Sequence, residues 1–133
     1  MTNKLIPGQK IPELEVNILD SKQWKLSEDT FTNMKLIVFY RGLHCPLCKA
    51  YIGELDKIIY EFSQLDIEVI AISGDSQEKA KLTKAKWGLT DITIGYNHSV
   101  DSMRQWGLYI SKGAFPSEPR LFNEPGIFIV KAD

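Results

Sequence analysis

The sequence has 133 residues, of which 44% are hydrophobic and 25% are charged, the ordinary composition of a globular domain that can bury a substantial core. Its 16 basic and 17 acidic residues leave a net charge of −1, so the charge balance indicates neither nucleic acid nor an anionic membrane as a partner. No apolar run approaches the roughly 18 residues of a membrane-spanning helix, and we expect residues 1–133 to form a single domain.

The first predicted elements are a small hairpin and a buried strand. Residues 11–16 alternate loosely between apolar and polar side chains, residues 20–22 have the composition of a turn, and residues 24–26 resume the alternation. Residues 36–40 (Leu-Ile-Val-Phe-Tyr) are a short continuous apolar run, which is typical of a strand buried on both faces. We expect an N-terminal β-hairpin packed at the edge of a sheet that contains this strand.

The hydrophobic period changes after Pro46. From there to Phe62 the apolar residues recur at spacings of three and four, which predicts an amphipathic helix. Pro46 suits the first turn of this helix, where a missing N–H breaks no intrahelical hydrogen bond. The predicted apolar face comprises Leu47, Tyr51, Leu55, Ile58, Ile59 and Phe62.

Strands and helices alternate through the rest of the chain. The predicted elements are strands at residues 67–73, 92–96 and 126–130, helices at residues 76–87 and 99–106, and an irregular segment at residues 107–124. Ser76 is a plausible N-cap for the first of these helices. The alternation predicts an α/β fold, with a central mixed and mostly parallel sheet flanked by helices.

The two cysteines, Cys45 and Cys48, stand where the buried strand gives way to the long helix. The first residues lack the apolar stretch of a signal peptide, so we expect a reducing cytoplasm, where a cysteine pair is more often functional than a structural crosslink. Two intervening residues at a helix start allow the sulfurs to meet in a disulfide, and the helix N-terminus stabilises a thiolate. The thiolate attacks a substrate, and the second cysteine then resolves the mixed disulfide or sulfenic acid. The pattern therefore predicts a redox-active site.

Two other interpretations of the cysteines stay open. They could be inert core residues, since free cysteine is often buried. They could also bind zinc together with His44 and His98, although these histidines are 54 residues apart, unlike the paired ligands of a zinc knuckle. Otherwise we expect His44 either to lie beside the thiols and tune them or to face solvent, and His98 to lie in a loop. No glycine-rich nucleotide-binding motif occurs, so we expect no cofactor. The wide spacing of the two histidines favours a site without metal.

Residues 39–49 (Phe-Tyr-Arg-Gly-Leu-His-Cys-Pro-Leu-Cys-Lys) resemble the Phe-Tyr-Arg-Gly-x-x-Cys-Pro-x-Cys signature of peroxiredoxin-like proteins in the alkyl hydroperoxide reductase and thiol-specific antioxidant (AhpC/TSA) family. Weaker matches, such as residues 106–108 and 124–130, extend the resemblance over nearly the whole chain. The resemblance implies a thioredoxin-like fold and an oxidoreductase, either a thiol peroxidase or a thiol–disulfide oxidoreductase. Its substrate would be a small peroxide or a disulfide, and a thioredoxin-like or other dithiol would regenerate it. The alternative is a binding module whose cysteines are vestigial or hold a metal.

The resemblance leaves the roles of the two cysteines open. In true peroxiredoxins the peroxidatic cysteine follows the strand's Phe by nine residues, which from Phe39 gives Cys48 and puts Cys45 at the place of the family's Thr. In thioredoxins the first cysteine is the nucleophile, which here is Cys45. Arg41 replaces the proline of the peroxidase motif, and the arginine that peroxidases carry before the last strand is absent. Arg41 or Arg120 could supply that positive charge instead.

Two further expectations concern the last predicted strand and the proline before it. Thioredoxins place a cis-proline immediately before this strand, facing the cysteines, and the resemblance predicts a cis peptide bond at Pro125. Similar proteins continue with a further strand and a helix that are not found in this sequence, so we expect a C-terminally truncated domain. Residues 127–130 would then form an exposed apolar edge, open to dimerisation or strand exchange with another chain.

Overall fold

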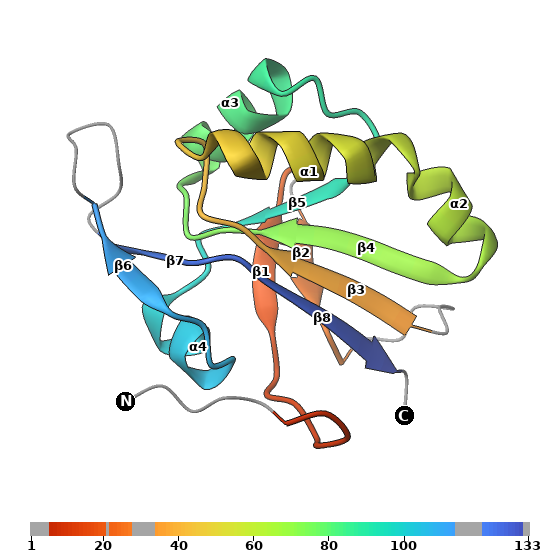
Figure 1. Cartoon of the computed structure of the whole chain (residues 1–133), viewed down its shortest axis with the longest axis vertical. Coiled ribbons are helices and arrows are strands. Elements are labelled where there is room, and N and C mark those ends of the chain that lie inside the picture. The colour runs from red at the N-terminus through yellow and green to blue at the C-terminus, as the bar shows by residue number, and fades with distance from the viewer. Residues whose placement is uncertain (1–5, 21, 28–33, 114–120, 132–133) are drawn as a thin grey trace.

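The centre of the computed structural model is a six-stranded mixed sheet (Figure 1). The structure describes residues 6–20, 22–27, 34–113 and 121–131. From edge to edge the strands are β2 (Lys22–Lys25), β1 (Glu15–Ile18), β5 (Thr93–Tyr96), β4 (Ile67–Ile72), β3 (Met34–Phe39) and β8 (Gly126–Lys131). The three central strands are parallel, while β1 and β8 run antiparallel to their central neighbours. The fold class predicted from the sequence is confirmed.

The predicted N-terminal hairpin is also confirmed. Strands β1 and β2 pair antiparallel, with Val16 opposite Trp24, and they lie at one edge of the sheet. Both of these side chains are buried. Because the side chains of a strand point alternately to its two faces, one face of the hairpin packs on the core and the other faces solvent.

Strand β3 is buried on both faces, as its apolar run predicts. Leu36, Val38 and Tyr40 belong to one core cluster. Ile37 and Phe39 belong to the second cluster, on the other face of the sheet. The strand therefore contributes side chains to two apolar layers, one on each face of the sheet. The loop that follows its C-terminal end starts between these two layers.

Helices cover both faces of the sheet (Figure 1). They are α1 (Pro46–Lys57), α2 (Ile59–Gln64), α3 (Gln77–Lys86) and α4 (Val100–Gln105). The first three pack on one face, and α4 packs on the other. The predicted N-cap Ser76 accepts a hydrogen bond from the Lys79 N–H at 3.3 Å. No helix in the described ranges is long and apolar enough to cross a membrane.

The single long helix predicted from the sequence is two helices. At Ile58 the backbone leaves α-helical geometry, with φ −114° and ψ 16°, and its N–H donates to the carbonyl of Leu55, only three residues back. The predicted apolar face is partly wrong as well. Leu47 is 77% exposed, whereas Cys48 and Ile52 are wholly buried. The buried stripe starts one position later than predicted because a cysteine, not a leucine, faces the core.

The segment predicted to be irregular contains two short strands, so that prediction is wrong. Strand β6 (Ile110–Lys112) pairs antiparallel with β7 (Leu121–Asn123), with Ser111 opposite Phe122. Each strand has only three residues, too few for an alternation of apolar and polar side chains to be recognised. This ribbon lies apart from the main sheet (Figure 1).

Strand β8 forms the sheet edge opposite the hairpin, as expected. Among the described strands, it pairs with β3 alone. Phe128 and Val130 pack against the core, whereas Ile127 and Ile129 are 63% and 70% exposed. The predicted exposed apolar edge is therefore present.

Candidate functional site

The two cysteines lie at the start of α1, as predicted. Cys45 is the N-cap residue, with an extended backbone, and its Sγ accepts a hydrogen bond from the backbone N–H of Cys48 at 3.2 Å. Pro46 follows at the first helical position, where a proline is tolerated. A thiolate on Cys45 would thus meet a backbone donor and the positive end of the helix dipole.

The environments of the two thiols differ. Cys45 is 4% exposed, whereas Cys48 is wholly buried in the core. Burial raises the pKa of the Cys48 thiol to about 11, and its hydrogen bond with Cys45 acts in the same direction. Cys48 therefore stays protonated at neutral pH. Both cysteines are free thiols in the structure.

Arg41 lies in the loop between β3 and α1, beside Cys45. Its guanidinium forms a bidentate pair with the Glu124 carboxylate, Nε to Oε1 at 2.7 Å and Nη2 to Oε2 at 3.0 Å. It also stands over the ring of Phe122, 5.5 Å from the ring centroid. The hydrogen bonds to Glu124 raise the pKa of Arg41, and the nearby Cys45 sulfur acts in the same direction. The other candidate, Arg120, lies outside the described residues.

Glu124 and Phe122 belong to the site, although the sequence did not single them out. Glu124 accepts hydrogen bonds from Arg41 and from the Ser111 hydroxyl on β6. The bond from Arg41 lowers the pKa of Glu124, and that from Ser111 adds to the effect, so the carboxylate is ionised at neutral pH. These contacts attach the β6–β7 ribbon to the cysteine loop. The sequence signal was Glu124 itself, an acidic residue two positions before the last strand.

The other predicted supporting residues, His44 and Pro125, directly precede Cys45 and directly follow Glu124 in the chain. His44 is half-buried, and its ring meets the Phe122 ring edge-on with centroids 4.7 Å apart. Pro125 is exposed, and no peptide bond among the described residues is cis, so the predicted cis bond at Pro125 is wrong. The trans form is the intrinsically favoured one, and an exposed proline has no packing that would impose the other.

His98 lies on the opposite face of the sheet from the cysteines. Its ring stacks on Phe39 with centroids 5.2 Å apart, and its Nε2 lies 2.7 Å from the Ser102 hydroxyl. The side chain is buried, and burial lowers its pKa to about 4, so it is neutral at pH 7. His98 lies in the loop between β5 and α4, as expected, and its ring is buried there. It also cannot join His44 and the cysteines around one zinc ion, and no cluster of His, Cys, Asp or Glu within the described ranges could hold a metal.

Two tyrosines enclose Cys48 on the core side. The hydroxyl of Tyr51 donates a hydrogen bond to the Cys48 sulfur at 3.4 Å. Tyr40, at the end of β3, is wholly buried and packs against Trp87 with ring centroids 5.8 Å apart. Burial raises the pKa of both phenols above the ordinary value. The sequence had marked Tyr51 only as an apolar-face residue.

Asp75 holds the loop that carries Arg41 and Cys45. Asp75 lies in the turn between β4 and α3, and its Oδ2 accepts a hydrogen bond from the backbone N–H of Leu43 at 2.8 Å. Gly42 has φ +138°, and a Cβ atom added there would lie 2.7 Å from Asp75 Oδ1. Asp75 is buried, and burial raises its pKa. The turn that carries Asp75 therefore anchors the cysteine loop at Leu43.

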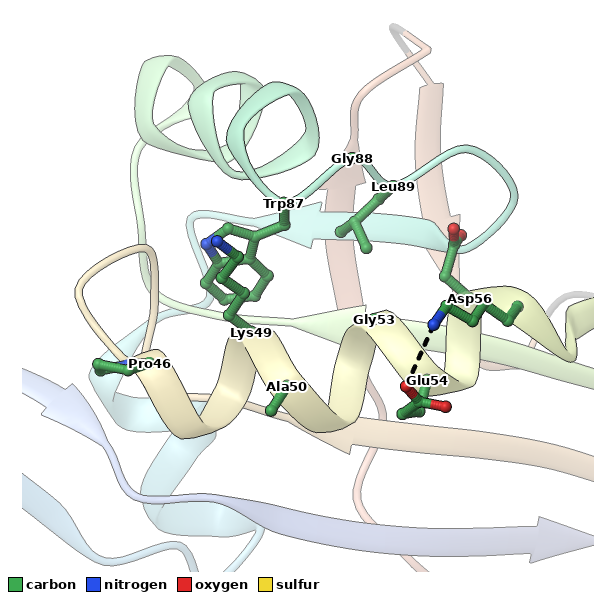
Figure 2. A pocket seen from close by; sticks show the side chains of 10 residues that line it. Pro46, Lys49, Ala50, Gly53, Glu54, Asp56, Trp87, Gly88 and Leu89 are labelled. Carbon is green, nitrogen blue, oxygen red and sulfur yellow. Dashed lines mark hydrogen bonds and ion pairs between the residues drawn. The ribbon is translucent and has the colours of Figure 1, made fainter.

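A shallow groove of about 380 Å³ runs between α1 and residues 87–89 (Figure 2). Pro46, Lys49 and Trp87 line one end, and an ion pair of 3.2 Å between Lys57 and Glu54 lies at the other. Neither cysteine lines this groove. The groove therefore lies beside the loop and helix start that carry the cysteines and does not include their side chains.

Comparison with known proteins matches a family and a fold. The model of the AhpC/TSA family matches residues 7–133. No curated protein matches the sequence. A peroxiredoxin-like protein from Aquifex aeolicus has 18% sequence identity and a TM-score of 0.78, covering 98% of this chain and 72% of its own. Peroxidoxin BcpB from Mycobacterium tuberculosis has 16% sequence identity and a TM-score of 0.76, and the match covers 95% of this chain and 79% of that protein. The thiol peroxidase from Chromobacterium violaceum has 17% sequence identity and a TM-score of 0.72, and the match covers 99% of this chain and 73% of that protein. At these identities the likeness shows the fold, which is the thioredoxin-like fold of peroxiredoxins.

Proposed function

The chain belongs to the AhpC/TSA family, and on that premise we propose that it is an oxidoreductase, a thiol peroxidase that works through Cys45 and Cys48. The observation that carries the proposal is the position of the Cys45 sulfur. It caps α1, accepts the Cys48 N–H at 3.2 Å and lies beside the Arg41 guanidinium. A backbone donor, a helix dipole and a cation thus converge where negative charge must be held.

We assign the attack to Cys45 and the resolving role to Cys48. Counting from Phe39 in the family pattern gives the opposite order, but the local environment favours Cys45. Cys48 is wholly buried, and burial raises its pKa to about 11. A wholly buried thiol that is protonated at neutral pH is a poor first nucleophile, since the thiolate is the reactive form.

The proposed cycle has three balanced steps. The Cys45 thiolate attacks the outer oxygen of a peroxide, so an S–O bond forms, the O–O bond breaks, and the leaving oxygen takes a proton to give water or an alcohol. The Cys48 thiolate then attacks the Cys45 sulfur, forming the disulfide and releasing hydroxide, which a proton converts to water. A dithiol reductant finally reduces the disulfide and is itself oxidised. The cytoplasm, where such reductants keep thiols reduced, is the compartment that this cycle requires.

The burial of the site favours a small oxidant. Cys45 is only 4% exposed. Hydrogen peroxide or a small organic hydroperoxide brings only a few atoms to the sulfur, whereas a disulfide in a folded protein is flanked by backbone on both sides. Regeneration calls for a dithiol whose attacking sulfur is exposed, as in thioredoxin-like proteins, and Cys45 is the cysteine nearer to solvent.

The test is a rapid-mixing titration of the reduced protein with hydrogen peroxide, followed by mass spectrometry. Wild type should form the Cys45–Cys48 disulfide, and Cys48→Ser should stop at a sulfenic acid on Cys45. Cys45→Ser should show no fast oxidation. A sulfenic acid in Cys45→Ser alone would reverse the assignment of the two cysteines. No fast reaction in any of the three proteins would rule out the peroxidase.

We also propose that β8 pairs with a second copy of the chain. It is an edge strand, and its exposed face carries Ile127 and Ile129. Unpaired, apolar edges invite antiparallel pairing. Sedimentation velocity should find a dimer that the change Ile129→Lys weakens, and a monomer at every concentration would contradict this pairing.

A further inference from the structure

We propose that Tyr51 is a positioning residue for the resolving step: its hydroxyl stabilises the Cys48 thiolate that attacks oxidised Cys45. The inference rests on the proposed function and deepens it, because it assigns a residue to the second half of the cycle. Neither the sequence pattern nor the family resemblance had given Tyr51 a role beyond packing.

The contact itself is direct. The Tyr51 Oη donates to the Cys48 Sγ at 3.4 Å. Both residues lie on α1, three positions apart, so the helix places them on one face as neighbours. Cys48 is wholly buried and Tyr51 is half-buried, so bulk water cannot substitute for this donor.

Cys48 needs such a donor because little else near it favours its charged form. Among the residues that the structure describes, the titratable side chains that interact with it are Cys45 at the helix cap, Tyr51 on α1 and Tyr40 directly after β3. Beyond Tyr40 lies the Asp75 carboxyl. Burial and Cys45 raise the pKa of Cys48, whereas the Tyr51 hydroxyl and the backbone N–H of Arg41 lower it. Tyr51 is therefore the one side chain in this group that helps the proton to leave.

Tyr51 acts as a donor and not as a base. Burial raises the pKa of its phenol above the ordinary value, and the hydrogen bond to Cys48 raises it further. The phenol therefore keeps its proton throughout the cycle. In the resolving step the Cys48 thiolate forms the S–S bond, the S–O bond of the Cys45 sulfenic acid breaks, and the oxygen leaves as hydroxide and is protonated to water. The Tyr51 hydrogen bond is strongest while Cys48 carries the negative charge.

The expected effect has a distinctive pH signature. Losing a hydrogen bond to a charged group should move the Cys48 titration upward by about one pH unit, a tenfold change in proton affinity. A more basic thiolate is also more nucleophilic, by a factor of roughly 3 per unit. At pH 7 the Tyr51→Phe change should therefore slow disulfide formation by only about threefold. At a pH above the Cys48 titration of both proteins, Tyr51→Phe should not slow disulfide formation. A purely structural defect would slow disulfide formation at every pH.

The first experiment needs no peroxide. In the Cys45→Ser background, where serine can still cap the helix, the Cys48 titration is followed by thiolate absorbance. Tyr51→Phe should shift it upward by about one pH unit. The control is Tyr60→Phe, which removes a hydroxyl from α2 at a position 70% exposed, and it should leave the titration where it was. An unshifted titration in Tyr51→Phe would overturn the proposal.

The second experiment adds the oxidant. With Cys45 present, Tyr51→Phe should form sulfenic acid at the wild-type rate and retain it about three times longer at pH 7. If the titration shifts but no protein reacts with peroxide, the Tyr51 contact stands and the peroxidase proposal fails. If Tyr51→Phe does not fold, 3-fluorotyrosine at position 51 provides a more acidic and stronger donor. The Cys48 titration should then move to lower pH, and no movement overturns the inference.

Discussion

The two faces of the central sheet each bury an ionisable side chain near the start of a helix, and they differ in what surrounds it. On the α1 face, Cys48 meets the Tyr51 hydroxyl and the Cys45 sulfur. On the α4 face, His98 lies against the ring of Phe39 and next to one serine hydroxyl. Burial disfavours the charged form in both places, so it raises the pKa of Cys48 and lowers that of His98.

The difference teaches that burial alone does not identify an active group. On the α1 face, the loop before the helix adds Arg41 and a backbone donor around the Cys45 sulfur, where a negative charge can be held. The His98 ring stacks on Phe39 and lies beside the Ser102 hydroxyl, and these neighbours suit a neutral ring. We therefore expect the chemistry on the α1 face and a contribution to stability alone on the α4 face.

The largest expected effect separates the two faces by activity. Cys45→Ser should slow peroxide consumption by at least roughly 10³-fold, because it removes the attacking sulfur. The matched change on the other face, His98→Phe, should leave the rate near that of wild type. Peroxide consumption by stopped flow measures both. A His98→Phe variant that folds but does not react would contradict the division between the faces.

The second effect separates the faces by stability. Because the folded His98 has a pKa of about 4, below its ordinary value of 6.5, the unfolded chain binds more protons between these values. The contribution of the neutral His98 to the free energy of unfolding is therefore fully present above about pH 6.5. As the pH falls towards 4, the free energy of unfolding decreases by up to about 3 kcal/mol. Urea unfolding from pH 7.5 to pH 4.5 should show this loss in wild type and a flatter curve in His98→Phe. Parallel curves for the two proteins would show that His98 does not titrate in this way.

The sequence predicted the layers of the fold well because those depend on local patterns. The apolar run of β3, the hairpin and the Ser76 cap were each recognisable within a few residues. The ribbon of β6 and β7 was missed because three-residue strands show no period. The trans bond at Pro125 contradicts an analogy with thioredoxins that no local pattern supported.

The candidate site was predictable only in part. Spacing alone placed Cys45 and Cys48 at a helix start, and Arg41 was named as a source of positive charge. The partner of Arg41 is Glu124, 83 residues away, and the anchor of the loop is Asp75 on another turn. Such contacts come from tertiary packing, and the spacing of apolar residues along the chain does not predict which distant residues meet. For the same reason, the buried position of His98 could not be predicted from its place before a helix.

The third prediction concerns the charge beside the attacking sulfur. Arg41→Met keeps an unbranched stem but removes the guanidinium, and it should slow the formation of sulfenic acid on Cys45 by about tenfold. The effect is moderate because the Arg41 side chain is 39% exposed and its field is partly screened. Stopped-flow oxidation of the Cys48→Ser protein measures it. Lys57→Met is the control, since it breaks an exposed ion pair on α1, the helix that Cys45 caps, and an equal loss there would mean that Arg41 has no special role.

The smallest effect tests whether the α1 face owes its geometry to the Asp75 contact. Gly42→Ala puts a side chain at φ +138° and a methyl group 2.7 Å from Asp75 Oδ1, so the carboxylate or the loop must shift. Gly88→Ala is matched in having a positive φ, +66°, but its added methyl group meets nothing within 4 Å. Both changes incur backbone strain, and the collision should make Gly42→Ala less stable by about 1 kcal/mol more.

The activity of the same pair decides what that difference means. A shift of the loop moves Arg41 and Cys45 relative to the helix start, so Gly42→Ala should also react more slowly with peroxide, while Gly88→Ala should not. Thermal unfolding and stopped-flow oxidation of the two variants, measured side by side, provide both numbers. If the two alanine variants lose equal stability and keep equal rates, the Asp75 carboxylate does not constrain the cysteine loop. The chemistry would then depend on the helix cap alone.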